Sequence, residues 1–322
     1  MAERKRVVLA EPRGFCAGVR RAIAIVERAL EVYGPPVYVR KEIVHNHYVV
    51  RGLESRGARF VDSEAEVPEG AVCVFSAHGV APAVHRASAD RGLEVIDATC
   101  PLVAKVHQEA RRFARDERTI LLIGHRDHEE VEGTYGEAPD RTVIVETVED
   151  VAALDLPRDA PVALLSQTTL SLDDTAGIVD ALRDRFDDLR EPPGGDICYA
   201  SQNRQNAVKA LAGRSDLVLV VGSVNSSNSI RMVEVARDAG VRAHLVPDVG
   251  ELEEGWLEGV ASVGVSAGAS APEILVDQLL DRLAALGYDR VEFETTATEN
   301  VVFNVPAGLA AAAPAGARPD PS

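Results

Sequence analysis

Short apolar runs, each followed by a polar or glycine-rich loop and then an amphipathic stretch, recur along the chain. The runs begin near Val7, Cys73, Thr119, Val162, Leu217 and Ser262. Each run is apolar throughout, which is typical of strands buried on both faces of a parallel sheet. The amphipathic stretches supply helices that cover those faces. The pattern predicts an α/β fold with mainly parallel sheets.

A weaker three-fold repeat is superimposed on this alternation. The segments LAEPRGFCAGVRRAIAI, VIDATCPLVAKVHQEARRFA and DICYASQNRQNAVKALA each place one cysteine in a short turn before or at the start of a helix. These cysteines are Cys16, Cys100 and Cys198. Three such units would form a pseudo-three-fold assembly whose thiols meet at its centre. Unrelated cysteines that happen to share this position are the plain alternative.

The repeat sets the expected domain boundaries. Three α/β units are expected at residues 14–100, 101–194 and 195–282, completed by residues 1–13 and 283–307. The linker-like segment EPPGGD marks the second boundary. The tail at 308–322 is rich in Ala, Pro and Gly, so we expect it to be disordered.

Charge and composition restrict the possible partners. The chain has 322 residues and a net charge of −17, which argues against non-specific binding to nucleic acid or anionic membranes. Its N-terminus carries only a short apolar run, and no stretch reaches membrane-spanning length. We therefore expect a cytoplasmic protein with no nucleic-acid or membrane partner. Cytoplasmic thiols stay reduced, so a disulfide framework is not expected.

The three repeat cysteines share an environment that favours the thiolate. A helix N-terminus lowers the pKa of a nearby thiol, which suits a metal ligand and a nucleophile equally. Three converging thiolates could hold zinc or an iron–sulfur cluster. A cluster with only three protein thiolates leaves one iron open to substrate. Cys73 differs because it lies inside the apolar run AVCVF, where we expect it to fill the core.

Three histidines lie just after strand-like runs, where open α/β sheets bind their ligands. They are His45, His78 and His128. Imidazole is a usual partner of anionic groups near neutral pH, although a single loop histidine is more often a surface residue. Glutamates follow His128 directly, and a buried carboxylate there could move protons. A solvated acidic turn is the alternative.

Three hydroxyl-rich loops, SQTTLS, NSSNS and SAGAS, also precede helices. N-capping accounts for one hydroxyl at each helix start, but not for the consecutive Ser226, Ser227 and Asn228. Hydroxyls together with the backbone amides of a first helical turn form a phosphate site. A phosphorylated ligand is therefore favoured. The sequence has no P-loop and no strand-linked G-x-G-x-x-G, so nucleotide binding lacks support.

Several segments together resemble the 4-hydroxy-3-methylbut-2-enyl diphosphate reductases, the LytB family. These segments are GFCAGVRRAI, VHNHYVV, FSAHGV, DATCPLVAKVH, HEEVEGT, QTTLS, DICYASQNRQNAV, GSVNSSNS, AGASAPE and ENVVFNVP. The resemblance implies a trefoil of three α/β units around one 4Fe–4S cluster per chain. Cys16, Cys100 and Cys198 would hold this cluster and leave one iron without a protein ligand.

The resemblance also implies a reaction. It is the two-electron reductive dehydroxylation of (E)-4-hydroxy-3-methylbut-2-enyl diphosphate to isopentenyl and dimethylallyl diphosphate. This reaction is the last step of the methylerythritol phosphate pathway. No flavin or nicotinamide motif is visible, so the electrons would come singly from an external carrier, ferredoxin or flavodoxin.

Further residues acquire roles by matching the family's motifs. Glu130 would deliver protons to the departing hydroxyl, Thr168 would help place the proton path, and His128 would take part in catalysis. The family has proline where this chain has Glu129. Glu129 therefore competes for the proton role, and we favour Glu130 because it keeps the family's position. The implied substrate-binding residues are His45, His78, His128, Thr168, Ser226, Ser227, Asn228 and Ser270.

Two other functions stay open on the residues alone. A zinc or di-metal phosphoesterase would use the three loop histidines and the nearby carboxylates. A non-catalytic iron–sulfur sensor would seal its cluster from substrate, which leaves the hydroxyl-rich loops without a role.

Overall fold

The computed structural model describes residues 5–313. Contacts divide the chain into two compact units. The first contains residues 5–17, His45–Val49 and Cys198–Val302, and the second contains Gly18–Val44, Val50–Ile197 and residues 303–313. The domain boundaries expected near residues 100 and 195 stay a prediction.

The first unit is built on a five-stranded sheet with strand order β11-β10-β12-β1-β13, and every strand pair is parallel. The strands are β1 (Arg6–Glu11), β10 (Leu217–Val221), β11 (Arg242–Val246), β12 (Ser262–Ala267) and β13 (Arg290–Thr295). The long helices are α8 (Tyr199–Ala212), α9 (Ser227–Asp238) and α10 (Glu273–Ala285), and η3 (Val249–Glu251) and η4 (Glu254–Leu257) are short 3-10 helices.

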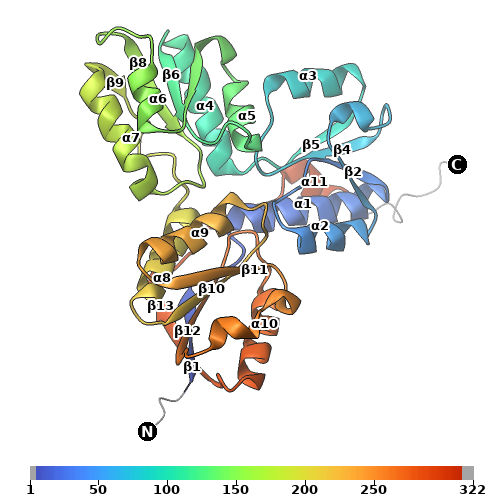
Figure 1. Ribbon diagram of the computed structural model, residues 1–322. Helices are drawn as coiled ribbons and strands as arrows, with labels where there is room; N and C mark the ends of the chain where they lie inside the picture. The colour runs from blue at the N-terminus through green and yellow to red at the C-terminus, as the bar shows by residue number, and fades with distance from the viewer. Residues whose placement is uncertain (1–4, 314–322) are drawn as a thin grey trace, which may run out of the picture. The chain divides into compact units, whose positions relative to one another are not determined.

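Helices cover both faces of this unit's sheet (Figure 1). Alternate strand residues pack on its opposite faces. Val7 and Leu9 of β1 contribute to the core that contains α10. Val8 and Ala10 contribute to the core that contains α8 and α9. All residues of β10 and β12 are buried. The runs are apolar throughout because both faces are covered, as the sequence predicts.

The second unit contains two four-stranded sheets, and both are parallel throughout. The sheet with order β3-β2-β4-β5 comprises β2 (Val37–Arg40), β3 (Ala58–Val61), β4 (Val72–Phe75) and β5 (Glu94–Asp97). The sheet with order β7-β6-β8-β9 comprises β6 (Thr119–Ile123), β7 (Thr142–Val145), β8 (Pro161–Ser166) and β9 (Asp188–Arg190). With the first unit's sheet they confirm the predicted α/β class and its three parallel-sheet units.

Helices link these strands. They are α1 (Ala17–Tyr33), α2 (His47–Glu54), α3 (Pro82–Asp90), α4 (Pro101–Arg115), α5 (Glu129–Tyr135), α6 (Val148–Ala153), α7 (Leu172–Arg185) and α11 (Ala307–Ala311), with 3-10 helices η1 (Glu64–Glu66) and η2 (Pro139–Arg141). The first residues of α1 and α2 belong to the first unit. α4 and α5 pack on one face of the β6 sheet, and α6 and α7 pack on the other. No helix among residues 5–313 is long and apolar enough to span a membrane.

The expected start of disorder at residue 308 is wrong for the residues that form α11. Leu309 is buried, and Arg28 donates a hydrogen bond to its carbonyl oxygen. Alanine has the highest helix propensity, so an alanine-rich segment with one apolar anchor folds as a short helix. Residues 314–322 of the predicted tail lie outside the described part of the chain.

Candidate functional site

Each of the three repeat cysteines lies directly before a helix, as predicted. Cys16 precedes α1, and Cys100 and Cys198 are the N-cap residues of α4 and α8. All three are half-buried, and none of them forms a disulfide. The backbone N–H of Cys16 donates to Ala269 at 3.1 Å, and that of Cys100 donates to Ala77 at 2.9 Å. These hydrogen bonds fix where the two side chains leave the backbone.

Cys16 and Cys198 belong to the same compact unit and act on the same tyrosine. Burial raises the pKa of Tyr199 to about 12, and the negative charges of Glu299, Cys16 and Cys198 add to this effect. Because both sulfur groups act electrostatically on the Tyr199 phenol, the side chains of Cys16 and Cys198 both lie near it.

Cys100 lies in the second unit, at the start of the helix that also carries Lys105. The ammonium group of Lys105 donates to the carbonyl oxygens of Pro193, at 3.1 Å, and Gly195, at 2.5 Å. It also lies 3.7 Å from the carboxylate of Asp196, which accepts a hydrogen bond from the N–H of Ser166. Lys105 therefore ties the helix begun by Cys100 to the segment that leads into Cys198.

Cys73 lies in β4, as predicted, and its side chain is wholly buried among apolar residues. Burial raises the pKa of this thiol to about 11, so it stays protonated. A protonated buried thiol is a poor metal ligand, because the thiolate is the coordinating form.

Hydroxyl and amide side chains gather where β10 and β12 end, at the carboxyl edge of the first unit's sheet. Ser226, Asn228 and Ser270, called here the Ser226–Ser270 cluster, are all buried. Ser270 Oγ donates to the backbone carbonyl oxygen of His45 at 2.9 Å, and Asn228 Oδ1 accepts from the N–H of Ala269 at 2.8 Å. Asn228 Nδ2 has no hydrogen-bond partner among the described residues.

N-capping explains part of this cluster only. Ser226 is the N-cap of α9, and its hydroxyl accepts from the N–H of Ser229. Ser270 does not cap α10, whose N-cap is Pro272. Ser227 is half-buried at the first position of α9. A buried amide donor without a partner, placed at a helix N-terminus with hydroxyls around it, fits an anionic group such as phosphate.

Glu130 and Thr168 form a buried pair between a helix and a turn of the second unit. Glu130, in the first turn of α5, is 1% exposed, and Thr168, in the turn after β8, is also buried. The N–H of Thr168 donates to Glu130 Oε1 at 2.6 Å, and Thr168 Oγ1 donates to Oε2 at 2.9 Å. Burial raises the pKa of Glu130 to about 7, although the Thr168 hydrogen bonds lower it. This carboxyl can hold or release a proton near neutral pH.

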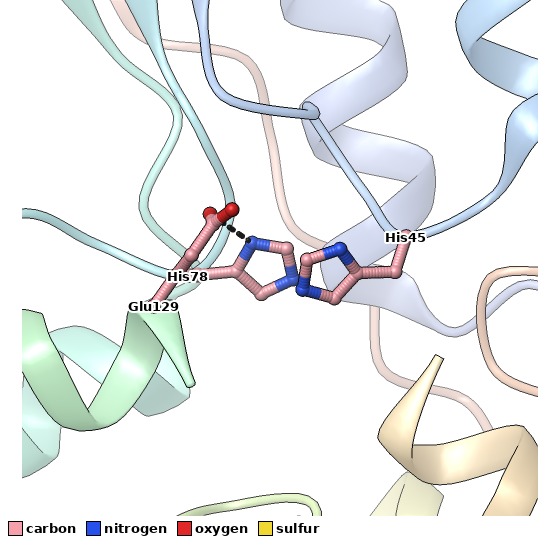
Figure 2. A group of neighbouring side chains, drawn as sticks. All are labelled: His45, His78 and Glu129. Carbon is pink, nitrogen blue, oxygen red and sulfur yellow. Dashed lines mark ion pairs between the residues drawn. The ribbon is translucent and has the colours of Figure 1, made fainter. Parts of the chain in front are cut away.

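His78, in the turn after β4, and Glu129, the first residue of α5, lie side by side in the same unit, as Figure 2 shows. His78 Nδ1 is 3.3 Å from Glu129 Oε2, and the His128 ring meets the His78 ring edge-on at 5.8 Å between centroids. Glu129 is more exposed than Glu130, and it pairs with an imidazole. The two adjacent glutamates therefore have different environments, and burial gives Glu130 a raised pKa.

His128 is also the N-cap of α5. Its Nδ1 accepts a hydrogen bond from the N–H of Glu130 at 3.2 Å. An accepting Nδ1 implies a neutral ring whose proton is on Nε2. His128 therefore presents an N–H donor on the side of the ring opposite to its own helix.

The buried pair of His107 and Glu137 was not predicted from the sequence. His107 Nδ1 lies 2.8 Å from Glu137, which Arg111 also contacts at 2.7 Å. Burial raises the pKa of Glu137, but hydrogen bonds from His107 and Arg111 outweigh it and hold the pKa low. Gly79, beside His78, has a φ of +79°, and a Cβ there would lie 2.9 Å from the His107 ring. The His107 ring therefore packs against Gly79, the residue that follows His78 in the same loop.

Comparison with known proteins gives the family of this chain. The family model described as LytB protein matches residues 7–284. A 4-hydroxy-3-methylbut-2-enyl diphosphate reductase of Nocardia farcinica is 60% identical, over 95% of this chain and 91% of its own. The enzyme of that name from Mycolicibacterium paratuberculosis is 62% identical, over 94% of this chain and 92% of its own.

Solved structures extend the likeness to the fold. The E-1-hydroxy-2-methyl-but-2-enyl-4-diphosphate reductase of Plasmodium falciparum superposes with a TM-score of 0.93 and 39% identity, covering 95% of this chain and 97% of its own. A structure of (E)-4-hydroxy-3-methyl-but-2-enyl diphosphate reductase, the terminal enzyme of the non-mevalonate pathway, has a TM-score of 0.63 and 32% identity, covering 87% and 99%. On the family match and these identities, the chain belongs to the LytB protein family.

Proposed function

We propose that this protein is a 4-hydroxy-3-methylbut-2-enyl diphosphate reductase of the non-mevalonate isoprenoid pathway. The relatives that cover nearly the whole chain carry this name. The reaction removes the C4 hydroxyl group of the allylic diphosphate as water, with the uptake of two electrons and two protons. One proton joins the departing oxygen, and the other joins an allylic carbon to give isopentenyl or dimethylallyl diphosphate.

The observation that carries the proposal is the set of three half-buried thiols, each at the start of a helix. Thiolates are the ligands of iron–sulfur clusters, so this donor set fits a 4Fe–4S cluster with one iron left without a protein ligand. Cys16, Cys100 and Cys198 would hold it. When bound, such a cluster supplies one-electron chemistry and a Lewis acid for the substrate's oxygen.

The chain's own residues would bind and orient the substrate. The Ser226–Ser270 cluster, together with Ser227, supplies hydroxyl and amide donors at the N-terminus of α9, where the helix dipole favours the negative charge of a diphosphate. His45, His78 and His128 supply ring N–H donors for its oxygens. The chain as a whole carries a net charge of −17, which repels an anionic substrate, so local N–H donors are needed to bind the diphosphate.

Glu130 would deliver the proton to the departing hydroxyl. Its pKa of about 7 lets it hold a proton at neutral pH and still give that proton up. Thr168 keeps the carboxyl in one orientation through two hydrogen bonds. We further propose that the protein is cytoplasmic and receives its electrons singly from ferredoxin or flavodoxin.

Purification without oxygen tests this proposal. We expect a brown protein that contains iron and sulfide and has a broad absorption band at about 400 nm, as thiolate-bound clusters do. A colourless protein that contains zinc or manganese and hydrolyses phosphate esters without an electron donor would contradict it. That result would favour the phosphoesterase alternative.

Replacing Asn228 with aspartate tests the diphosphate site. Asn228→Asp keeps the oxygen that accepts from Ala269 but replaces the buried amide donor with an oxygen that repels phosphate. We expect KM for the allylic diphosphate to rise about 10- to 100-fold, the effect of losing a hydrogen bond to a charged group. The control is Asn206→Asp, at an exposed position of α8. Equal KM values in the two variants would remove Asn228 from the site.

The pH dependence of turnover tests the Glu130–Thr168 pair. A general acid must be protonated, so kcat should fall as the pH rises through about 7, the pKa of Glu130. The Thr168 hydroxyl stabilises the charged carboxylate and so lowers this pKa. Thr168→Val removes that hydroxyl, so the falling limb should move to higher pH. A limb that stays in place or moves to lower pH would contradict the assignment.

A further inference from the structure

Arg204 of α8 is a fully buried arginine that the proposed reaction does not use. Its Nε and Nη2 donate to the carbonyl oxygen of Gly14 at 2.9 and 2.6 Å, and its Nη1 donates to that of Ala200 at 2.9 Å. Nη1 also donates to Glu299 Oε1 at 2.9 Å. A buried charge is tolerated only when it is paired and hydrogen-bonded, and this guanidinium meets both conditions.

The first of these carbonyls belongs to the loop that carries Cys16. Gly14 has a φ of +63°, and a Cβ there would lie 3.1 Å from the carbonyl oxygen of Ala271, so the loop needs glycine. The N–H groups of Gly14 and Cys16 are held by Ala267 and Ala269. Arg204 holds the carbonyl side of the same loop. The cysteine's backbone is therefore restrained on both sides.

The second carbonyl belongs to the first turn of α8, which Cys198 begins. Ala200 follows Cys198 by two residues, and its carbonyl oxygen accepts from the same guanidinium that holds Gly14. One planar group thus joins the Cys16 loop to the Cys198 turn within one compact unit.

Glu299 completes the arrangement from the segment after β13. Its side chain is 15% exposed, and it also accepts a hydrogen bond from Asn203 at 3.1 Å. Glu299 both balances the charge of the guanidinium and fixes its plane.

We propose that Arg204, oriented by Glu299, is a positioning residue that sets the separation of Cys16 and Cys198, and that its charge raises the reduction potential of the group these cysteines hold. The inference rests on the proposed function, because it takes that group to be an iron–sulfur cluster. Fixed charges near a cluster set its potential, and partners that orient its ligands set how tightly it is held.

Two substitutions of Arg204 separate its geometry from its charge. Arg204→Gln removes the charge and the fork of donors, whereas Arg204→Lys keeps the charge but cannot reach Gly14, Ala200 and Glu299 together. In reconstituted protein, both variants should lose the cluster to an iron chelator about 10- to 100-fold faster than the unaltered chain. Only Arg204→Gln should shift the reduction potential to more negative values.

Glu299→Gln supplies an independent test and a result of opposite sign. It leaves the guanidinium charge unbalanced, so the potential should become more positive while retention of the cluster weakens less. The matched control is Arg214→Gln, which removes an arginine of the same unit that pairs with Glu292 and Glu294 of β13. It should change neither the potential nor the retention.

Thermal unfolding of the cluster-free variants shows whether each chain folds. If Arg204→Gln does not fold, Arg204→Lys and Glu299→Gln decide the question. Folded variants of Arg204 and Glu299 that match Arg214→Gln in potential and in chelator resistance would overturn the inference and leave the proposed function standing. An unaltered chain that takes up no cluster would instead contradict the proposed function, and the inference with it.

Discussion

Serine at Cys16, Cys100 or Cys198 should abolish both the cluster and turnover, whereas serine at Cys73 should preserve both. A free serine hydroxyl is not deprotonated near neutral pH, so serine is a far weaker ligand of iron than a thiolate. With only two thiolates left, the cluster loses one of its few anchors to the protein. The loss of the cluster is measured by the iron and sulfide content per chain and by the absorbance at about 400 nm.

Cys73→Ser is the matched control because the chemical change is the same and only the location differs. Its hydroxyl would be buried in β4 among apolar residues, so we expect a loss of about 1–3 kcal/mol in the free energy of unfolding. Iron content should not change. Retention of the cluster in Cys16→Ser with its loss in Cys73→Ser would overturn the ligand assignment.

Glu130→Gln should leave the cluster and substrate binding intact and yet reduce kcat by about 10²- to 10⁴-fold, the usual contribution of a positioned general acid. The amide keeps the shape of the carboxyl group, can still accept from the N–H of Thr168 and can donate to its hydroxyl oxygen. It cannot supply a proton. Single-turnover rates and KM, measured on protein with full iron content, separate the lost proton transfer from lost binding.

Glu129→Gln is the control for this variant, because the two glutamates are adjacent but Glu130 is fully buried with a raised pKa, whereas the Glu129 side chain is 20% exposed. We expect a much smaller effect on kcat from Glu129→Gln, since Glu129 pairs with His78 and is partly exposed. Full activity in Glu130→Gln, with the large loss in Glu129→Gln, would move the proton role to Glu129.

The features that could be predicted from the sequence are those with a local signal. Uninterrupted apolar runs give strands covered on both faces, and β10 and β12 are buried along their whole length. A cysteine directly before an amphipathic stretch gives a thiol at a helix start, as at Cys100 and Cys198. His78 and Thr168 lie in loops that directly follow strands. Such loops could be predicted to hold ligand-binding residues, because ligands of open α/β sheets bind at the carboxyl ends of the strands.

The features that could not be predicted depend on contacts between distant segments. Arg204 and Glu299 lie 95 residues apart, and nothing near either residue indicates that it is buried against the other. In the sequence, His107 is one more polar position of an amphipathic helix. In the structure, its ring lies against the turn that contains Gly79. The short helix α11 had a usable signal in its alanines, which the compositional bias of the tail obscured.

The electron balance of turnover under anaerobic conditions tests the proposed reaction most directly. The reconstituted protein would receive the allylic diphosphate and a chemical one-electron reductant, and both products and reductant would be counted. We expect isopentenyl and dimethylallyl diphosphate to form together, with two electrons consumed for each molecule of product and no product without reductant. Release of inorganic phosphate or diphosphate without electron consumption, or a cluster-loaded protein that leaves the substrate unchanged, would contradict it.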